Sequence, residues 1–72
     1  MNIVITYCKP CGYEKRAQDL AQSLARELGV QPILAAGKGG IFDVAVDGRS
    51  VAKKTRDGFP DAATVLRALQ AP

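Results

Sequence analysis

The feature that most constrains the fold is a long amphipathic segment directly after a short run of β-branched residues. In residues 13–28 the apolar side chains recur at intervals of three and four, which places them on one side of a helix: Tyr13, Ala17, Leu20, Ala21, Leu24, Ala25 and Leu28. The preceding residues 2–6 (NIVIT) are typical of a central strand that is apolar on both faces. A strand, a helix and a second strand predict a right-handed crossover between two parallel strands.

Two further strands are predicted in residues 30–35 and 41–46. Pro32 favours an edge position for the first, because proline has no N–H to donate to a neighbouring strand. The second alternates, with Phe42, Val44 and Val46 on one face and Asp43 and Ala45 on the other. That alternation indicates a sheet with one packed face and one partly wet face.

The sequence after residue 46 predicts a hairpin and a closing helix. Asp47-Gly48 favours a two-residue turn, from which residues 49–53 return as a strand. Pro60 predicts the first turn of a final helix, where its missing N–H costs nothing, and Asp61 complements the positive helix end. The order is therefore β-α-β-β-β-α in a single domain, residues 1–72. We expect an α/β fold with a four-stranded mixed sheet and two helices packed on one face.

Length and charge limit the classes of function. A chain of 72 residues forms one small core, and 24% charged with 47% hydrophobic residues is typical of a folded protein. The net charge of +3 is mild, and Asp57 interrupts the basic cluster of Lys53, Lys54 and Arg56. We predict a solvated edge there and no nucleic-acid partner. The sequence shows no signal peptide or membrane span, so we expect a cytoplasmic monomer without a membrane partner.

The chemistry resides in the pair Cys8 and Cys11, separated by Lys9 and Pro10. Cytosolic thiols are kept reduced, so a pair at this spacing is more typical of redox catalysis or metal binding than of a permanent bridge. The pair is predicted to follow the first strand and to open the first helix, where the helix dipole and Lys9 favour a thiolate. Pro10 stiffens the loop, and Gly12 permits close approach of another backbone.

Three uses of the pair compete. In thiol–disulfide exchange one cysteine attacks and the other resolves, so two cysteines suffice. Structural zinc needs four ligands, and with no histidine and no third cysteine two chains would have to contribute. A ferredoxin-like Cu(I) chaperone needs a strand after its second helix, which this sequence does not predict. We therefore expect a redox protein without a metal site. The residues do not separate an enzyme from a binding module that the cysteine pair switches.

Two stretches of the chain resemble the selenoprotein W-like (Rdx) family. Residues 4–29 (VITYCKPCGYEKRAQDLAQSLARELG) carry its Tyr-Cys-x-x-Cys-Gly-Tyr pattern between first strand and first helix. Residues 39–69 (GGIFDVAVDGRSVAKKTRDGFPDAATVLRAL) resemble its later progression to Asp57-Gly58-Phe59. The resemblance implies a thioredoxin-like fold and thiol redox chemistry, often linked to glutathione.

The resemblance also implies roles for the two cysteines. A disulfide-bearing protein or glutathione would be the partner, with glutathione as reductant or co-substrate and no bound cofactor. Thioredoxin geometry makes Cys8 the exposed attacking sulfur and Cys11 the buried resolving one. However, the selenocysteine of animal members matches Cys11, which points to the opposite order. We expect Cys8 to attack first, with the alternative open.

Four residues outside the cysteine pair are candidates for supporting the redox site or for binding its substrate. Tyr7 is predicted at the rim of the site, and Tyr13 in the core. Phe59 is expected near the cysteines, either as a shield for the sulfurs or as a hydrophobic staple on the last helix. Gly58, with the start of that helix, is either a site for a glutathione carboxylate or a simple turn.

Overall fold

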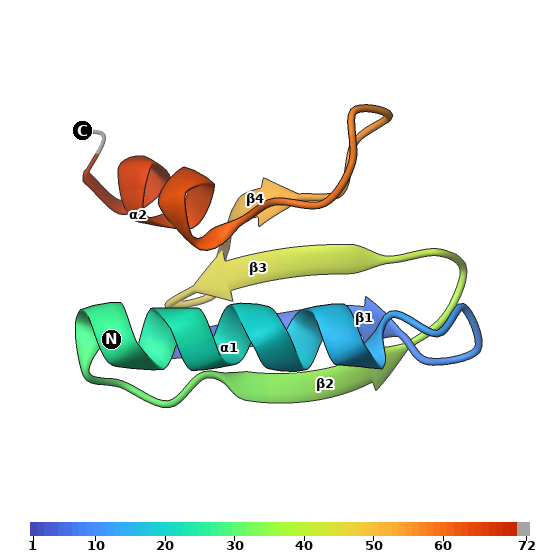
Figure 1. Ribbon diagram of the computed structural model, residues 1–72, viewed down its shortest axis with the longest axis horizontal. Coiled ribbons are helices and arrows are strands. Elements are labelled where there is room, and N and C mark those ends of the chain that lie inside the picture. The colour runs from blue at the N-terminus through green and yellow to red at the C-terminus, as the bar shows by residue number, and fades with distance from the viewer. Residues whose placement is uncertain (71–72) are drawn as a thin grey trace.

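The computed structural model describes residues 1–70 and contains four strands and two helices in the predicted order β-α-β-β-β-α (Figure 1). The elements are β1 (Ile3–Cys8), α1 (Glu14–Leu28), β2 (Ile33–Gly37), β3 (Phe42–Val46), β4 (Arg49–Lys53) and α2 (Ala62–Gln70). The predicted hairpin is confirmed: Asp47 and Gly48 both have positive φ, at 52° and 82°, and β4 covers the predicted residues.

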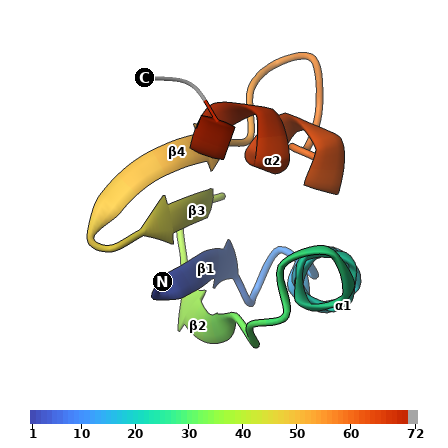
Figure 2. The same cartoon turned by 90° about the vertical axis from the view of Figure 1, so that its left-hand side faces the viewer.

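The strands form one mixed sheet in the order β2-β1-β3-β4. β1 is parallel to β2 and antiparallel to β3, and β3 is antiparallel to β4. Figure 2 shows α1 and α2 on the same side of this sheet, as predicted. β1 is thus hydrogen-bonded on both sides, and its carboxyl end lies beside the end of β2 and the start of β3.

The core lies between the sheet and the two helices. Its buried members are Ile3, Ile5 and Tyr7 of β1, Phe42 and Val44 of β3, Ala17, Leu20, Ala21 and Leu24 of α1, and Val65 of α2. The helical and strand periodicities of the sequence predict nearly all of these positions. Both patterns therefore direct their apolar faces into one shared layer.

Several element boundaries differ from the prediction, among them the starts of β2 and α2. β2 begins at Ile33, whose register partner is Val4, so Pro32 lies just before the strand. The predicted position of this strand, β2, at an edge of the sheet is confirmed. α2 begins at Ala62, because the carboxylate of Asp61 accepts the Thr64 N–H at 2.8 Å and the Thr64 hydroxyl at 2.8 Å. This capping leaves Pro60 outside the helix.

The element order excludes the ferredoxin-like fold. That fold has two strands between its helices, whereas three strands, β2, β3 and β4, lie between α1 and α2. No helix in this part of the chain has the length and apolarity needed to cross a membrane.

Three aromatic rings join the loop before α2 to the start of α1. The Phe59 ring meets Tyr13 edge-on at 4.8 Å and Phe42 at 5.1 Å between centroids, and Tyr13 meets Phe42 at 6.5 Å. The guanidinium carbon of Arg16 lies 4.1 Å from the Phe59 ring centre. Phe59 therefore packs against the start of α1 and against β3.

Replacing Phe59 tests this packing. We expect Phe59→Ala to lower the free energy of unfolding by about 2–3 kcal/mol, because a half-buried ring loses its contacts and leaves a void. Phe59→Leu, which keeps most of the apolar volume, is the matched control and should lose less than half as much. Urea unfolding followed by circular dichroism measures both. Equal stability of Phe59→Ala and the natural chain would show that the cluster contributes little.

The cap on α2 has a pH dependence. The backbone N–H of Thr64, followed by its hydroxyl, lowers the pKa of Asp61 below its ordinary value of 3.8. Its contribution to stability is therefore complete above 3.8 and is lost as pH falls through the lowered value. We expect Asp61→Ala to lower the melting temperature by roughly 5 °C at pH 7, with the difference shrinking in acid. Asp61→Asn, which keeps an acceptor, should show little loss at pH 7, and melting curves across the pH range check both variants.

Candidate redox site

The two cysteines form an intramolecular disulfide at the carboxyl end of β1. The Cα atoms of Cys8 and Cys11 are 5.3 Å apart, within the range that a disulfide spans. The bridge closes a turn in which the Gly12 N–H donates to the Lys9 carbonyl at 3.0 Å. Pro10 occupies the second position of this turn, where its fixed φ is favourable. The sequence Cys-Lys-Pro-Cys-Gly therefore encodes a turn that holds the two sulfurs together.

The two sulfurs differ in their access to solvent. Cys8 is the last residue of β1 and is only 1% exposed, whereas Cys11 lies in the turn and is exposed. The expectation of an exposed Cys8 and a buried Cys11 is wrong for this chain. The physical reason is that β1 extends through residue 8, because the Cys8 N–H donates to the Ile41 carbonyl at 2.7 Å.

The turn also separates the pair from α1. Gly12 has φ of 79°, in the left-handed region, so the chain reaches helical geometry only after Tyr13 and α1 begins at Glu14. The prediction that the pair opens the helix is wrong, and Cys11 does not lie in its first turn. A Cβ added at Gly12 would contact nothing within 4 Å. Glycine is therefore required for its backbone conformation and not for close approach of another backbone.

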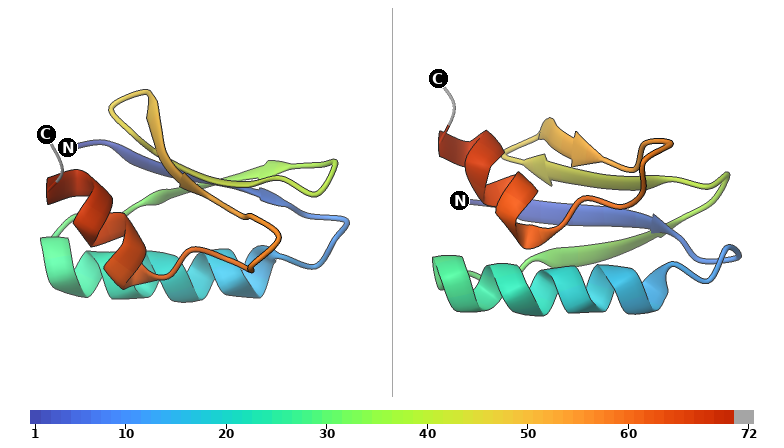
Figure 3. Two further views of the ribbon diagram at one scale, coloured as in Figure 1. Left: turned by 90° about the horizontal axis from the view of Figure 1, so that it is seen from above. Right: turned by 45° about the horizontal axis from the view of Figure 1, so that its top comes forward.

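The loop between β2 and β3 supports the turn. The Lys9 N–H donates to the Gly37 carbonyl at 3.1 Å, next to the Cys8 bond to Ile41. Figure 3 shows this loop and the cysteine turn together at one end of the sheet. A Cβ at Gly37 would lie 3.0 Å from a methyl of Ile41 and 3.2 Å from a methyl of Thr6. Sequence reasoning missed Gly37 and Ile41, although the dense glycines of the loop were a signal.

The other predicted residues lie at different depths. Lys9 and Pro10 are exposed beside Cys11. Tyr7 is 6% exposed and belongs to the core, so its predicted place at a rim is wrong: its side chain points to the helix-covered face. Tyr13 is partly buried against the core, as predicted. Cys11 therefore lies at the surface, and its immediate surroundings are small and mostly polar.

Gly58 and Phe59 lie in the loop before α2. Thr55 and Gly58 exchange backbone hydrogen bonds at 3.0 and 3.1 Å, and Gly58 has φ of 128°. The ring of Phe59 contacts Tyr13, two residues beyond Cys11. The carboxylate of Asp61 already occupies the first turn of α2, where a glutathione carboxylate was predicted to bind. A role of Gly58 and Phe59 in binding substrate stays a prediction.

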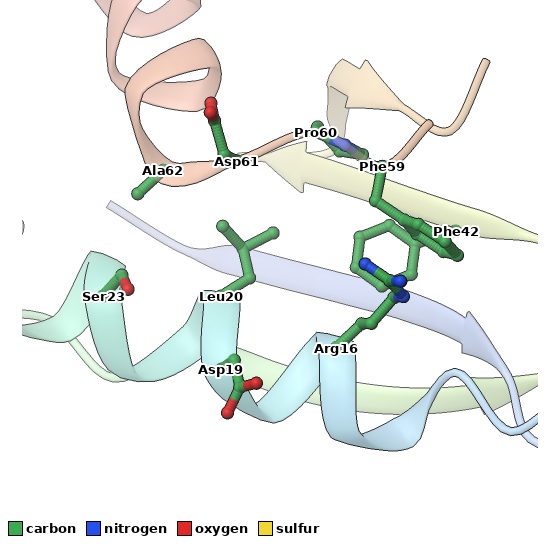
Figure 4. A pocket seen from close by; sticks show the side chains of 9 residues that line it. All are labelled: Arg16, Asp19, Leu20, Ser23, Phe42, Phe59, Pro60, Asp61 and Ala62. Carbon is green, nitrogen blue, oxygen red and sulfur yellow. The ribbon is translucent and has the colours of Figure 1, made fainter. Parts of the chain in front are cut away.

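A groove of about 250 Å³ lies between α1 and residues 59–62, and Figure 4 shows the side chains that line it. Its floor is apolar, with Leu20 and Phe42. Its charged side chains already have partners within the chain: Arg16 lies over the Phe59 ring, Asp19 accepts from Lys15 at 2.8 Å, and Asp61 caps α2. The groove therefore directs little free charge at a ligand. Residues 1–70 also contain no cluster of three or more potential metal ligands.

Comparison with known proteins places this geometry in a family. A family model described as the Rdx family matches residues 2–71. A crystal structure of a selenoprotein W-related protein from Vibrio cholerae superimposes with a TM-score of 0.83 at 25% identity, covering 96% of this chain and 91% of that one. A crystal structure of a Bordetella parapertussis protein gives 0.85 at 30% identity, covering 96% and 92%.

Two curated relatives are longer than this chain. They are proteins named migration and invasion enhancer 1, 32% identical in Mus musculus and 29% identical in Bos taurus, each matched over 97% of this chain. The chain spans 63% of the length of each. The match of the family model over residues 2–71, together with the thioredoxin-like arrangement around Cys8 and Cys11, shows that the chain belongs to the Rdx family.

Proposed function

We propose that this chain is a thiol–disulfide redox protein that cycles between the Cys8–Cys11 disulfide and the dithiol, and that Cys11 is the sulfur that exchanges with partners. One observation carries the proposal: the bridge joins Cys8, a residue that is 1% exposed, to Cys11, a residue that is exposed. Exchange requires the attacking thiolate to approach along the S–S axis. Only the Cys11 end of this bond is open to an incoming sulfur.

The exchange proceeds in two steps. A partner thiolate attacks the Sγ of Cys11, the Cys8–Cys11 bond breaks, and a bond between the partner sulfur and Cys11 forms. The electron pair of the broken bond stays on Cys8, which takes a proton from water. A second partner thiolate then attacks the partner sulfur and releases Cys11 as a thiolate. The partner pair is oxidised by two electrons, and the chain is left as the dithiol.

The reverse direction uses the same asymmetry. The Cys11 thiolate attacks a partner disulfide, and Cys8 resolves the mixed disulfide. A thiolate on buried Cys8 is poorly solvated, which favours closure of the bridge over a lasting open state. The exposed Lys9 beside Cys11 supports the attacking thiolate by its charge. Glutathione or a disulfide-bearing protein fits this role as the partner.

Mild oxidation tests the cycle itself. We expect the reduced protein to lose two hydrogen atoms per chain and to form the Cys8–Cys11 bridge within one chain, because the turn already holds the sulfurs together. Mass spectrometry of the intact protein and of its peptides measures this. The Cys8→Ser/Cys11→Ser chain is the control and should not change mass. Two thiols that stay free, or bridges only between chains, would contradict the proposal.

Single variants test the order of attack. With a mild disulfide donor such as glutathione disulfide, we expect Cys8→Ser to accumulate a mixed disulfide through Cys11. The rate of Cys11→Ser should be lower than that of Cys8→Ser by a factor of roughly ten or more, because its remaining thiol is buried. Mass spectrometry of timed samples gives both rates, and Cys8→Ala repeats the test without a buried hydroxyl. Faster trapping by Cys11→Ser would assign the attack to Cys8.

Turnover separates an enzyme from a binding module. A coupled assay with glutathione reductase or thioredoxin reductase measures repeated reduction of a disulfide substrate. Steady turnover supports an oxidoreductase. Reversible oxidation without turnover would indicate that the cysteine pair instead switches binding to another protein.

A further inference from the structure

Four lysines gather at the end of the sheet that carries the disulfide. β1 and β2 both end there, β3 begins there and β4 ends there. Lys9 follows β1, Lys38 follows β2, and Lys53 and Lys54 close β4. Segments far apart in the sequence thus bring these four lysines to one end of the sheet, where β1, β2 and β4 end (Figure 1).

The charge of these lysines is largely free. The ion pair found between side chains of residues 1–70 joins Lys15 to Asp19, so none of the four lysines has a carboxylate within bonding reach. The acidic residues at this end are Glu14, Asp43 and Asp57. Asp43 faces Lys53 across the strands, but its carboxylate accepts the Ser50 hydroxyl. The end that presents Cys11 is therefore positively charged overall.

A groove of about 260 Å³ lies at the basic end of β4 and extends to Ile41, the residue whose carbonyl pairs with Cys8. It is lined by Gly40, Ile41, Phe42, Asp43, Lys53 and Lys54. Ile41 is 39% exposed, and its carbonyl accepts the N–H of Cys8. One end of the groove thus adjoins the strand that ends in the disulfide, and the other adjoins two cations. Lys54 is also held near the Phe59 ring, at 5.6 Å from its centre.

We propose that this groove binds an extended, acidic segment of the partner protein, next to the cysteine that exchanges with Cys11. An apolar side chain of the segment packs on Ile41, and its carboxylates lie on Lys53 and Lys54. Adjacent strands are about 4.8 Å apart, so β4 lies roughly 10 Å from β1. An extended chain covers that span in about three residues. The acidic residues therefore lie about three or four positions from the partner cysteine.

The proposal rests on the proposed redox function and names the partner that it selects. The electrostatic attraction between the lysines and the acidic residues of the partner acts before the two sulfurs come into contact. It therefore raises the rate of exchange with acidic partners. Salt screens such exposed charges, so the preference is largest at low ionic strength.

Activated peptides test the preference. Three peptides carry one cysteine as a thionitrobenzoate mixed disulfide, with glutamates, glutamines or lysines three and four positions away on both sides. The reduced chain attacks the peptide sulfur and releases coloured thionitrobenzoate, which gives the rate. We expect the acidic peptide to react roughly tenfold faster than the basic one at low salt, with the ratio falling toward one in high salt.

Matched variants locate the effect. Lys53→Gln/Lys54→Gln removes two charges from this end and should cut the acidic preference at least about threefold. Arg26→Gln/Arg49→Gln removes two charges from the last turn of α1 and the start of β4, at the opposite end of the sheet, and should preserve it. Circular dichroism confirms that each variant is folded. If the lysine double variant unfolds, the single variants Lys53→Gln and Lys54→Gln replace it, each compared with Arg26→Gln.

The outcomes separate the two proposals. Equal rates for acidic and basic peptides at low salt would overturn the proposal that the groove binds an acidic segment, and would leave the redox function standing. The same holds if both double variants lower the preference equally, because the effect would then be net charge alone. Failure of the oxidised chain to react with neutral dithiothreitol would overturn the redox function itself.

Discussion

The site depends on the hydrogen bond from the Cys8 N–H to the Ile41 carbonyl, at 2.7 Å. This bond extends the central strand to its last residue and places Cys8 inside the protein. The next bond, from the Lys9 N–H to Gly37, anchors the start of the turn to the edge strand. Cys11 is then carried out into solvent by a turn of fixed shape. The difference in access between the two sulfurs follows from this pairing, and the proposed direction of exchange follows from that difference.

The other elements hold this turn in position. α1 and the aromatic cluster of Tyr13, Phe42 and Phe59 hold the chain on the far side of Gly12. The loop from Gly37 to Ile41 supports the turn with its main chain, and a Cβ at Gly37 would lie only 3.0 Å from a methyl of Ile41. The sheet topology brings the ends of three strands to the same place, and the lysines with them. The reactive cysteine pair and the lysines therefore lie at one end of a small sheet, while the stability of the fold comes mainly from the core between the sheet and the helices.

Local patterns predicted most of the fold because each depends on neighbours in sequence. The stripe on α1, the alternation of Phe42, Val44 and Val46, and the Asp47-Gly48 turn have short-range causes. The errors have longer-range or competing causes. Pro60 suits a first helical turn, but the Asp61 carboxylate captures Thr64 and starts α2 later. Tyr7 adjoins the cysteine in sequence, but the strand pleat directs its side chain into the core.

The sequence by itself determined the chemistry available to this protein: two cysteines three positions apart, held by a proline–glycine turn between a strand and a helix. It also determined the element order, because the periodicity of hydrophobic residues and the turn residues both depend only on neighbours in the sequence. Only the tertiary structure decided which sulfur is exposed. That choice depends on Ile41, thirty-three positions beyond Cys8 in the chain, whose carbonyl extends β1 by pairing across the sheet. The gathering of four lysines at the end of the sheet that carries the disulfide has the same origin, because strand pairing and not sequence spacing sets which chain segments end together.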